Sequence, residues 1–331
     1  MTTLDSFNDR LLEGTSRSFY ITLKRLPKSV KGQIGLLYLL ARISDTIADS
    51  SKGEREYLLG LLSDYNERAQ GRSRRLPDFT ELSEFQENPA EAALLIGAYG
   101  PIGLLDKSSE IDKELIRRCL GIIISGQERD LMRFSGKENG VISSLENYDE
   151  MDDYAYRVAG SVGEFWTEMC LRHAFRVGDR EKEEMMEAGV RFGKALQMIN
   201  ILRDIPEDLG IGRCYIPSDD LNNVGLTPED LLEKANMDSF RPLMDIYIQR
   251  AEEHLMEAVK YIQMLPHRQY RLRGACMIPV IIGKRTLELL KTENVLDGEK
   301  RIKISRKEIR GIIRKVLISI PSKRMSSSLL Y

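Results

Sequence analysis

The chain has 331 residues, of which 42% are hydrophobic and 30% are charged, and its 49 Lys and Arg nearly balance 51 Asp and Glu. This composition is typical of a soluble globular protein. A formal net charge of −2 lacks the strong positive charge of proteins that bind nucleic acid non-specifically. We therefore expect no nucleic-acid partner.

The chain shows no sign of export or of a membrane span. Its four cysteines and three histidines are scattered without metal-ligand spacing, so neither a zinc site nor a disulfide framework is expected. Asp5, Asp9 and Arg10 precede any apolar run, which is unlike a signal peptide. The longest uncharged apolar stretches, 36–41 and 276–282, are far shorter than the roughly 18 residues of a spanning helix. We expect a cytoplasmic protein without a transmembrane segment.

Apolar residues recur at spacings of three and four almost throughout, and the period-two runs that indicate strands are missing. The pattern predicts helices, in chain order, over 29–50, 54–70, 90–99, 110–134, a long segment from the 144–153 region to about 176, 181–205, 239–264, 268–293 and 305–318. No repeat or linker is visible. The prediction is an all-α fold in a single domain over 1–331, a helical bundle around a central space.

Two prolines set expected boundaries between these helices. Pro206 lacks the N–H that would pair with the Leu202 carbonyl, so the helix over 181–205 should kink or end there. Thr227-Pro228-Glu229-Asp230 has the residue types of a helix start, with a cap residue, a proline and two acids.

Two pairs of aspartates are candidates for chemistry, Asp45 with Asp49 and Asp204 with Asp208. A spacing of four places both carboxylates of a pair on one face of a helix. With 21 Asp in the chain, chance alone produces about one such pair. Two further pairs have the same spacing, namely Asp5 with Asp9 and Asp149 with Asp153.

The two candidate pairs differ from the others because each extends a longer polar stripe within an apolar helix. The stripes are Tyr38, Arg42, Asp45, Asp49 and Gln197, Asn200, Asp204, Asp208. Neighbouring carboxylates repel each other, and partial burial increases that cost unless a cation lies between them. A solvated acidic face with a local Arg–Asp ion pair is the alternative for either stripe alone.

Two matching stripes favour a site for Mg²⁺ and diphosphate. Oxygen ligands without His or Cys suit Mg²⁺, which takes one or two carboxylates together with substrate phosphates. Arginines near the stripes could hold the remaining phosphate oxygens in bidentate fashion. These arginines are Arg17, Arg42, Arg203 and Arg213.

Five ordered blocks over roughly residues 14–290 resemble the squalene and phytoene synthases. The blocks are Ser16-Arg17-Ser18-Phe19, Tyr38-x-x-x-Arg42-x-x-Asp45-Thr46-x-x-Asp49, Tyr154-Ala155-Tyr156-Arg157-Val158-Ala159-Gly160-x-x-Gly163, Gln197-x-x-Asn200-x-x-Arg203-Asp204-x-x-x-Asp208 and Gly212-Arg213-Cys214-Tyr215-Ile216-Pro217. The resemblance implies the all-α isoprenoid synthase fold, with a deep apolar channel and a metal–diphosphate site at one end. It implies head-to-head joining of two prenyl diphosphates, in which the donor ionises and the cation is attacked by the acceptor's double bond before proton loss closes a cyclopropane.

The resemblance also implies a role for each matching residue. Asp45, Asp49, Asn200, Asp204 and Asp208 would bind Mg²⁺. Residues expected to contact the substrate are Arg17, Ser18, Phe19, Tyr38, Arg42, Val158, Gly160, Gln197, Arg203 and Arg213. Tyr154 would take part in the proton-transfer or cation-handling step, with the four aspartates as the other catalytic residues. From the residues alone, Gly160 and Gly163 are equally well explained by helix–helix packing.

The blocks favour a bacterial squalene synthase, although they divide on the product. Asp45 followed by Thr46 resembles the squalene-synthase version of the first motif, whereas Gly212–Pro217 is closer to bacterial phytoene synthases. A squalene product would require NADPH, and no residues for that cofactor can be identified. The alternatives are a phytoene synthase that uses two geranylgeranyl diphosphates, and a dehydrosqualene or presqualene diphosphate synthase without reduction.

More distant alternatives agree less well with the blocks. A chain-elongating prenyltransferase or a terpene cyclase would share the fold and the use of Mg²⁺, but neither resembles the Tyr154–Gly163 or Arg213–Pro217 blocks. A non-catalytic isoprenoid-binding or assembly protein would be expected to have lost aspartates or arginines that are present here. Because the substrates and product are apolar, we also expect peripheral membrane contact through an amphipathic surface.

Overall fold

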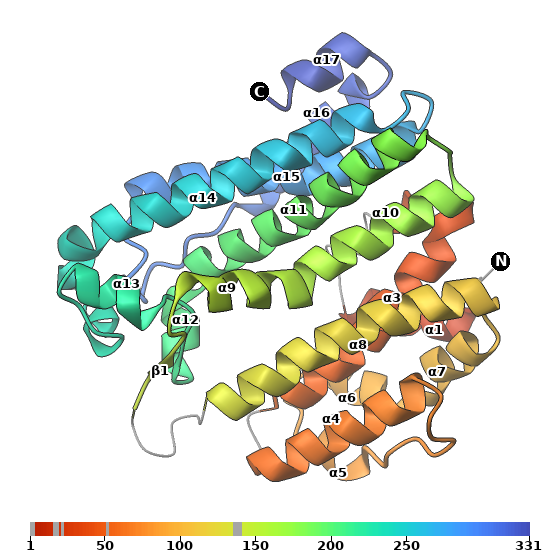
Figure 1. Ribbon diagram of the computed structural model, residues 1–331, viewed down its shortest axis with the longest axis horizontal. Helices are drawn as coiled ribbons and strands as arrows, with labels where there is room; N and C mark the ends of the chain where they lie inside the picture. Colours follow the sequence, from red (N-terminus) through yellow and green to blue (C-terminus); the bar gives the residue numbers. More distant parts are fainter. Residues whose placement is uncertain (1–3, 16–19, 21–22, 51–52, 135–140) are drawn as a thin grey trace. The chain divides into compact units, whose positions relative to one another are not determined.

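The computed structural model describes residues 4–15, 20, 23–50, 53–134 and 141–331, and helices make up most of them (Figure 1). The chain divides into two compact units. The first contains residues 1–132 and 165–176, and the second contains 133–164 and 177–331. The described part is all-α apart from one two-residue strand pair, which confirms the predicted fold class.

The first unit is organised around one long apolar helix. Its helices are α1 (Ser6–Thr15), α3 (Lys28–Ala48), α4 (Arg55–Ala69), α5 (Thr80–Glu84), α6 (Pro89–Ile96), α7 (Tyr99–Asp106) and most of α8 (Glu110–Arg133), with the second part of α10 (Ser161–His173). α3 packs against α1, α4, α6 and α7. Fourteen of its 21 residues are buried, so only a narrow polar stripe remains for solvent or a ligand.

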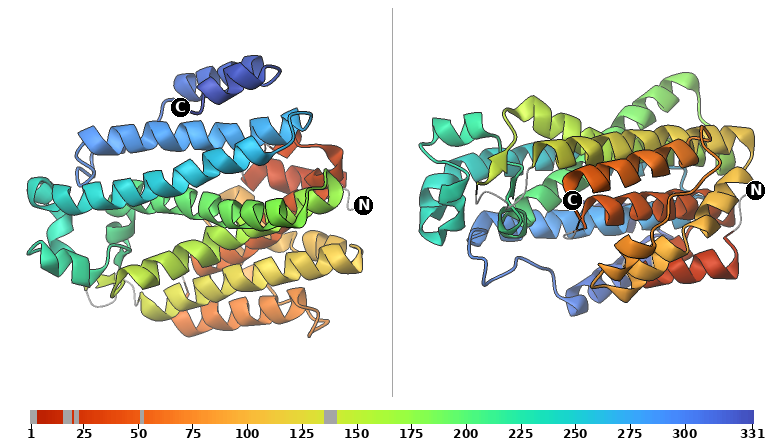
Figure 2. Two further views of the ribbon diagram at one scale, coloured as in Figure 1. Left: turned by 45° about the horizontal axis from the view of Figure 1, so that its top comes forward. Right: turned by 90° about the horizontal axis from the view of Figure 1, so that it is seen from below.

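The second unit has a core of long helices. Its elements are β1 (Ser143–Ser144), α9 (Tyr148–Ala155), the π-helix η2 (Tyr156–Gly160), the start of α10, α11 (Asp179–Arg203), α12 (Ile205–Gly210), β2 (Arg213–Cys214), α13 (Ser218–Asn223), the 3₁₀ helices η3 (Glu229–Leu232) and η4 (Lys234–Asn236), α14 (Met237–Met264), α15 (Tyr270–Thr292), α16 (Arg306–Ser319) and α17 (Lys323–Ser328). Figure 2 shows α11, α14 and α15 side by side, and each packs against the other two.

Most of the predicted helices are present within a few residues of the expected bounds, and the exceptions have local causes. The long helix expected up to about residue 176 is interrupted by η2 and ends at His173. The helix start expected at Thr227 is a single 3₁₀ turn, which Asp230 caps by accepting from the backbone and hydroxyl of Thr227 at 2.8 Å. The expectation of no strands was wrong by one short parallel pair, β1 with β2.

Several expected absences concern the described residues. All four cysteines are buried, and none of them is in a disulfide. Within the described part of the chain, no helix combines the length and hydropathy that a membrane span requires. The prediction of one domain over the whole chain stays a prediction.

Candidate active site

The first aspartate pair lies at the C-terminal end of α3. Asp45 is in the last turn, and Asp49 is the residue directly after the helix. The Asp49 N–H donates to the Asp45 carbonyl at 2.8 Å, so the helical spacing continues to Asp49. Asp45 and Asp49 therefore share one face, as their spacing predicts.

The position of this pair is electrostatically unfavourable without a cation. The C-terminal end of a helix carries a partial negative charge, which repels carboxylates placed there. Partial burial and the nearby charge of Asp49 raise the pKa of Asp45 to about 7, against the opposing influence of Arg42 and Gln127. The Asp45 side chain is still 40% exposed, which leaves it accessible to an ion.

Two neighbours orient Asp45 within the first unit. Gln127 of α8 donates from Nε2 to Asp45 Oδ1 at 2.5 Å. Arg42 lies one turn earlier on α3, with Nη1 at 3.9 Å from Asp45 Oδ2 and Nη2 at 2.5 Å from Glu91 Oε1. Arg42 and Asp45 were predicted from the stripe, whereas Gln127 and Glu91 were not.

The second aspartate pair is in the second unit, where α11 gives way to α12. Asp204 is the residue after α11, and Pro206 is in the first turn of α12, so the helix ends where Pro206 predicted. Backbone hydrogen bonds still run from Asp204 N to Asn200 O at 2.8 Å and from Asp208 N to Asp204 O at 3.0 Å. Asn200, Asp204 and Asp208 thus keep helical spacing across the break.

Arginines surround Asp204. Arg203 donates to it from Nε at 2.8 Å and from Nη2 at 2.5 Å, which is a bidentate pair. Arg301 approaches the same carboxylate at 3.4 Å and also pairs with Glu207 at 2.8 Å. Arg203 was predicted as a substrate residue, while Arg301 was missed because it lies 97 residues from Asp204 along the chain.

Tyr154 lies on α9 against two other aromatic side chains. Its ring stacks on Tyr215 with centroids 4.6 Å apart, and Tyr215 makes an edge contact with Phe134 at 5.2 Å. Aromatic faces stabilise cations electrostatically. Tyr215 was part of the quoted Gly212–Pro217 block but received no role, and Phe134 was not identified from the sequence.

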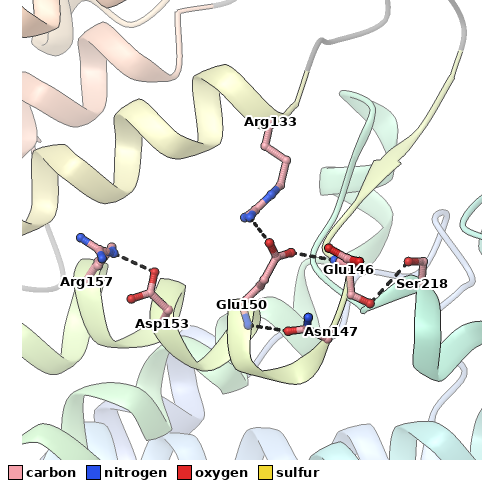
Figure 3. Close-up of polar contacts among 7 residues, drawn as sticks. All are labelled: Arg133, Glu146, Asn147, Glu150, Asp153, Arg157 and Ser218. Carbon is pink, nitrogen blue, oxygen red and sulfur yellow. Dashed lines mark hydrogen bonds and ion pairs between the residues drawn. The ribbon is translucent and has the colours of Figure 1, made fainter.

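The N-terminal end of α9, and with it Tyr154, is fixed by a polar cluster (Figure 3). Glu150 pairs with Arg133 at 2.5 Å and accepts from the Glu146 N–H at 2.7 Å. Asn147 caps α9 by accepting from the Glu150 N–H at 3.1 Å. Further along α9, Asp153 pairs with Arg157 at 2.7 Å. Asp153, which has the same spacing from Asp149 as the candidate pairs have, is therefore in a local Arg–Asp ion pair.

Arg213 is held by the strand pair β1–β2. Ser143 is opposite Arg213, and the Ser143 N–H donates to the Gly212 carbonyl at 3.1 Å. Gly212 has φ +82°, a left-handed conformation that a residue with a Cβ adopts only at a cost. Gly212 therefore makes the turn that delivers Arg213 into β2.

Val158 and Gly160, which the resemblance implied as substrate contacts, lie in the π-helix η2. A Cβ on Gly160 would lie 3.1–3.4 Å from side-chain atoms of Tyr156, Val190 and Lys194. A Cβ on Gly163 would lie 1.9 Å from the Gly189 carbonyl oxygen of α11. Both glycines thus permit close packing on α11, and the substrate contacts of Val158 and Gly160 stay a prediction.

Of the remaining predicted residues, the structure describes two, Tyr38 and Gln197. Tyr38 and Gln197 are half-buried on their stripes, one in α3 and one in α11. Arg17, Ser18 and Phe19 lie outside the described residues.

The two aspartate pairs fit Mg²⁺ that takes most of its ligands from substrate phosphates and water. Among the residues that the structure describes, no group of three or more His, Cys, Asp or Glu could hold a metal by itself. Mg²⁺ does not require such a cage, because it keeps several waters and takes one or two carboxylates plus phosphate oxygens. The pair at the end of α3, with a raised pKa at Asp45, is the arrangement that a divalent cation would stabilise.

Comparison with known proteins identifies the family. The family model described as squalene/phytoene synthase matches residues 12–308. The chain therefore belongs to the squalene/phytoene synthase family.

Two curated relatives illustrate the range of the similarity. The chain is 28% identical over 276 residues to a presqualene diphosphate synthase from Rhodopseudomonas palustris, covering 83% of this chain and 82% of that protein. It is 29% identical over 244 residues to a bifunctional lycopene cyclase/phytoene synthase from Phaeosphaeria nodorum, covering 70% of this chain. It spans only 37% of the length of the fungal protein.

Solved structures confirm the fold. TcSQS in complex with the ligand E5700 superposes with a TM-score of 0.76 at 18% identity, covering 98% of this chain and 89% of that one. The squalene synthase HpnC from Alicyclobacillus acidocaldarius gives a TM-score of 0.60 at 19% identity, with 86% and 91% covered. These matches show the isoprenoid synthase fold that the resemblance implied.

Proposed function

We propose that this chain joins two farnesyl diphosphates head to head and forms presqualene diphosphate as its first product. The observation that carries the proposal is the repeated placement of an aspartate pair at a helix C-terminus, once after α3 and once after α11. The first pair brings carboxylates together at the C-terminal end of α3, which disfavours them, whereas Asp204 also takes the N-cap position of α12 and pairs with Arg203. A bound cation would offset the cost at the first pair, and we assign the second pair to Mg²⁺ because it repeats the same spacing on a polar stripe.

The residues have separable tasks in this reaction. Mg²⁺ would be held by Asp45 and Asp49 in the first unit and by Asn200, Asp204 and Asp208 in the second, and it would neutralise diphosphate charge as the donor C–O bond breaks. Arg42, Arg203 and Arg213 would bind the outer phosphate oxygens and keep the leaving group in place. The product forms when the acceptor's double bond attacks the allyl cation, a proton is lost and one diphosphate is released.

Tyr154 and its aromatic neighbours would serve the cationic part of the reaction. The stacked Tyr154–Tyr215 pair, with Phe134 at its edge, presents π-faces that favour a nearby positive charge. We propose that Tyr154 either accepts the proton lost at cyclopropane closure or orients the cation for that step. Tyr215 also carries a hydroxyl, and we choose Tyr154 because it belongs to the Tyr154–Gly163 block.

Squalene is the second candidate product. The Rhodopseudomonas palustris relative bears the name of the unreduced product, which favours presqualene diphosphate. Asp45 followed by Thr46 resembles squalene synthases, which favours a further reduction by NADPH. Both products require the same first condensation and the same carboxylates.

A product assay tests the proposal. Purified protein with Mg²⁺ is given farnesyl or geranylgeranyl diphosphate, with and without NADPH. Half of each reaction is treated with phosphatase before extraction, so that a diphosphate product is recovered as its alcohol for mass spectrometry. We expect presqualene alcohol only in the phosphatase-treated farnesyl samples, in equal amounts with and without NADPH.

The other outcomes of the assay are equally informative. Squalene in the NADPH samples would show that the protein also reduces presqualene diphosphate. Phytoene from geranylgeranyl diphosphate alone would contradict the choice of substrate. Absence of every coupled product, with either substrate, would support the non-catalytic alternative.

A further inference from the structure

The C-terminal part of the second unit carries an unusual concentration of positive charge. Residues 300–324 include ten Lys or Arg and a single acid, Glu308, for a net charge of +9. The other residues of the chain therefore carry −11, since the whole chain carries −2. A charge asymmetry of this size is typical of a segment that meets an anionic surface.

Helix α16 displays much of this charge on one face. Its opposite face is buried in the second unit, where Ile312 and Val316 are at most 8% exposed and the helix packs on α15. The outward residues Arg306, Arg310 and Arg314 are spaced at four and are all exposed. Figure 1 shows α17 on the outer side of the second unit, beyond α14.

The arginines of this face have no internal counter-charge among the described residues. Glu308 is already paired with Arg285 of α15 at 2.9 Å. No described carboxylate forms an ion pair with Arg306, Arg310 or Arg314. Like charges at this spacing repel each other by a few tenths of a kcal/mol per pair on a helix, so an external anion would relieve the repulsion.

Exposed apolar side chains are present on α16 and on α17. Leu317 is 46% exposed, Ile318 is 69% exposed, and Met325 of α17 is 50% exposed. At 100° per residue, Leu317 lies between Arg306 and Arg310 around the axis of α16, and Ile318 lies just beyond Arg314. Basic and apolar side chains on one exposed helix face are the combination that partitions into a bilayer interface.

A groove beside α16 adds further cationic side chains. It lies between α15 and α16 and has a volume of about 520 Å³. Four cationic side chains line it, Lys284, Arg285, Lys307 and Lys315, together with the carboxylates of Glu288 and Glu308, which both pair with Arg285. Lysine ammonium groups act as point charges toward phosphate. The groove could thus receive a lipid headgroup next to the exposed apolar residues.

We propose that the exposed face of α16, with Met325 of α17, binds the surface of a bilayer that contains anionic phospholipid. We call this the α16 face, and it comprises Arg306, Arg310, Arg314, Leu317, Ile318 and Met325. Arginines contact the headgroups, and Leu317 and Ile318 enter the interface. The inference stands on charge and exposure and is independent of the proposed reaction, although apolar prenyl products would benefit from delivery at a bilayer.

Vesicle co-sedimentation tests the α16 face. The full chain is mixed with vesicles of phosphatidylcholine alone or with 30% phosphatidylglycerol, in 0.1 M salt. We expect binding to the anionic vesicles only. This binding should weaken in 1 M salt, because the Debye length then falls to about 3 Å and the attraction between arginines and headgroups is screened. The double variant R310E/R314E should lower the vesicle partition coefficient at least about 30-fold, as expected for losing two surface arginines.

Matched variants separate the α16 face from bulk charge. R74E/R75E makes the same change of charge at exposed arginines of the first unit and should leave binding unchanged. I318S keeps the charge and should weaken binding several-fold by removing an inserted side chain. Circular dichroism melting verifies that each variant is folded.

Four results would overturn the proposal. They are failure to bind anionic vesicles, equal binding to both kinds of vesicle, equal losses in R310E/R314E and R74E/R75E, and release by inorganic diphosphate at constant ionic strength. The last result would make the α16 face a site for a soluble anion. None of them affects the proposed reaction, which is read out separately by product formation.

Discussion

At the scale of single residues, Asp49 and Asp204 occupy equivalent backbone positions in separate units. Each is the residue directly after a long helix, with φ −93° and ψ 3° for Asp49 and φ −97° and ψ 13° for Asp204. At Asp49 the partially negative helix end would favour Lys or Arg, whereas Asp204 also takes the N-cap position of α12, where Asp is favourable. The placement of Asp49 therefore favours a function in cation binding over one in stability.

The first prediction concerns Asp45. Asp45→Asn removes a carboxylate charge while preserving size, so turnover should fall by roughly 10²-fold or more with little change in folding. Steady-state kinetics at saturating Mg²⁺ measures the effect. Asp149→Asn is the control, because Asp149 is exposed and belongs to a pair with the same spacing. Equal activity of the two variants would show that Asp45 is not a metal ligand.

Gln127 is predicted to act as a positioning residue through Asp45. Gln127→Leu removes the 2.5 Å hydrogen bond to Asp45 Oδ1, so the concentration of Mg²⁺ for half-maximal activity should rise about 10–100-fold. A titration of activity against Mg²⁺ measures this requirement. Gln249→Leu, at an exposed site on α14, should not change it. A loss of maximal rate without a shifted Mg²⁺ requirement would contradict the positioning role.

Asp112 gives a prediction of pH dependence. Burial tends to raise the pKa of Asp112, but hydrogen bonds with His173 at 2.7 Å and Gln33 at 3.2 Å outweigh it and hold the pKa below 3.8. The ionised form is thus preferred in the folded state, and its contribution to stability is complete above the unfolded pKa and lost as pH falls through the folded one.

The matching experiment compares the wild type with Asp112→Asn. The variant should lose about 1–3 kcal/mol of unfolding free energy at pH 7, since buried partners are left poorly satisfied. Urea denaturation at several pH values should show this difference shrinking below pH 3.8. A difference that stays constant down to pH 2 would contradict the assigned direction.

At the scale of secondary-structure elements, two close approaches position η2 and α10 on α11. A Cβ on Gly193 would lie 2.0 Å from the Ala159 carbonyl oxygen, which parallels the 1.9 Å approach at Gly163. Such contacts fall well below van der Waals distance and involve backbone that cannot rotate away. The packing of this layer therefore depends on the absence of a side chain at both sites.

Gly163→Ala should accordingly destabilise the protein. Separation of the helices would cost about 1–3 kcal/mol, seen as a lower midpoint of urea denaturation. Gly60→Ala is the opposite control, because a Cβ at Gly60 in α4 meets nothing within 4 Å. It should gain about 0.5–1 kcal/mol from its higher helix propensity. A neutral Gly163→Ala variant would show that the helices can shift.

Helix periodicity predicted the elements but not their interruptions. The stripes of α3 and α11 were visible because apolar neighbours repeat with the helical period over many residues. The π-helix η2 has no such signature, since its sequence continues an apolar pattern without Gly or Pro until Gly160. The strand pair β1–β2 was missed because two residues are too few to show alternation.

At the scale of the whole molecule, motifs in the sequence point to the candidate site residues but not to the side chains that hydrogen-bond with them. Gln127 lies 82 residues from Asp45, and Glu91 lies 49 residues from Arg42. Contacts at such separations depend on how the helices pack, which the period of a single helix does not encode. Gln127 could have been noticed from the sequence, because it is a polar residue on the mostly apolar, buried side of α8.

A prediction at this scale concerns ligand-linked stability. Mg²⁺ with inorganic diphosphate should raise the free energy of unfolding by about 2.7 kcal/mol at 100 times the dissociation constant, which corresponds to several degrees in Tm. Differential scanning fluorimetry measures the shift in wild type and in Asp204→Asn, which should lose most of it. If diphosphate with EDTA gave the same shift, the arginines alone would bind the anion.

The π-helical turn at Tyr156–Gly160 has a consequence for the phase of the helix that contains it. A π turn holds one residue more than an α turn, and each residue advances an α-helix by 100°. Deleting any one of these five residues would restore an α turn and swing Tyr154 by about 100° around the axis of α10. The number of residues between Tyr154 and Gly163 thus sets the direction of the tyrosine, whatever their identities.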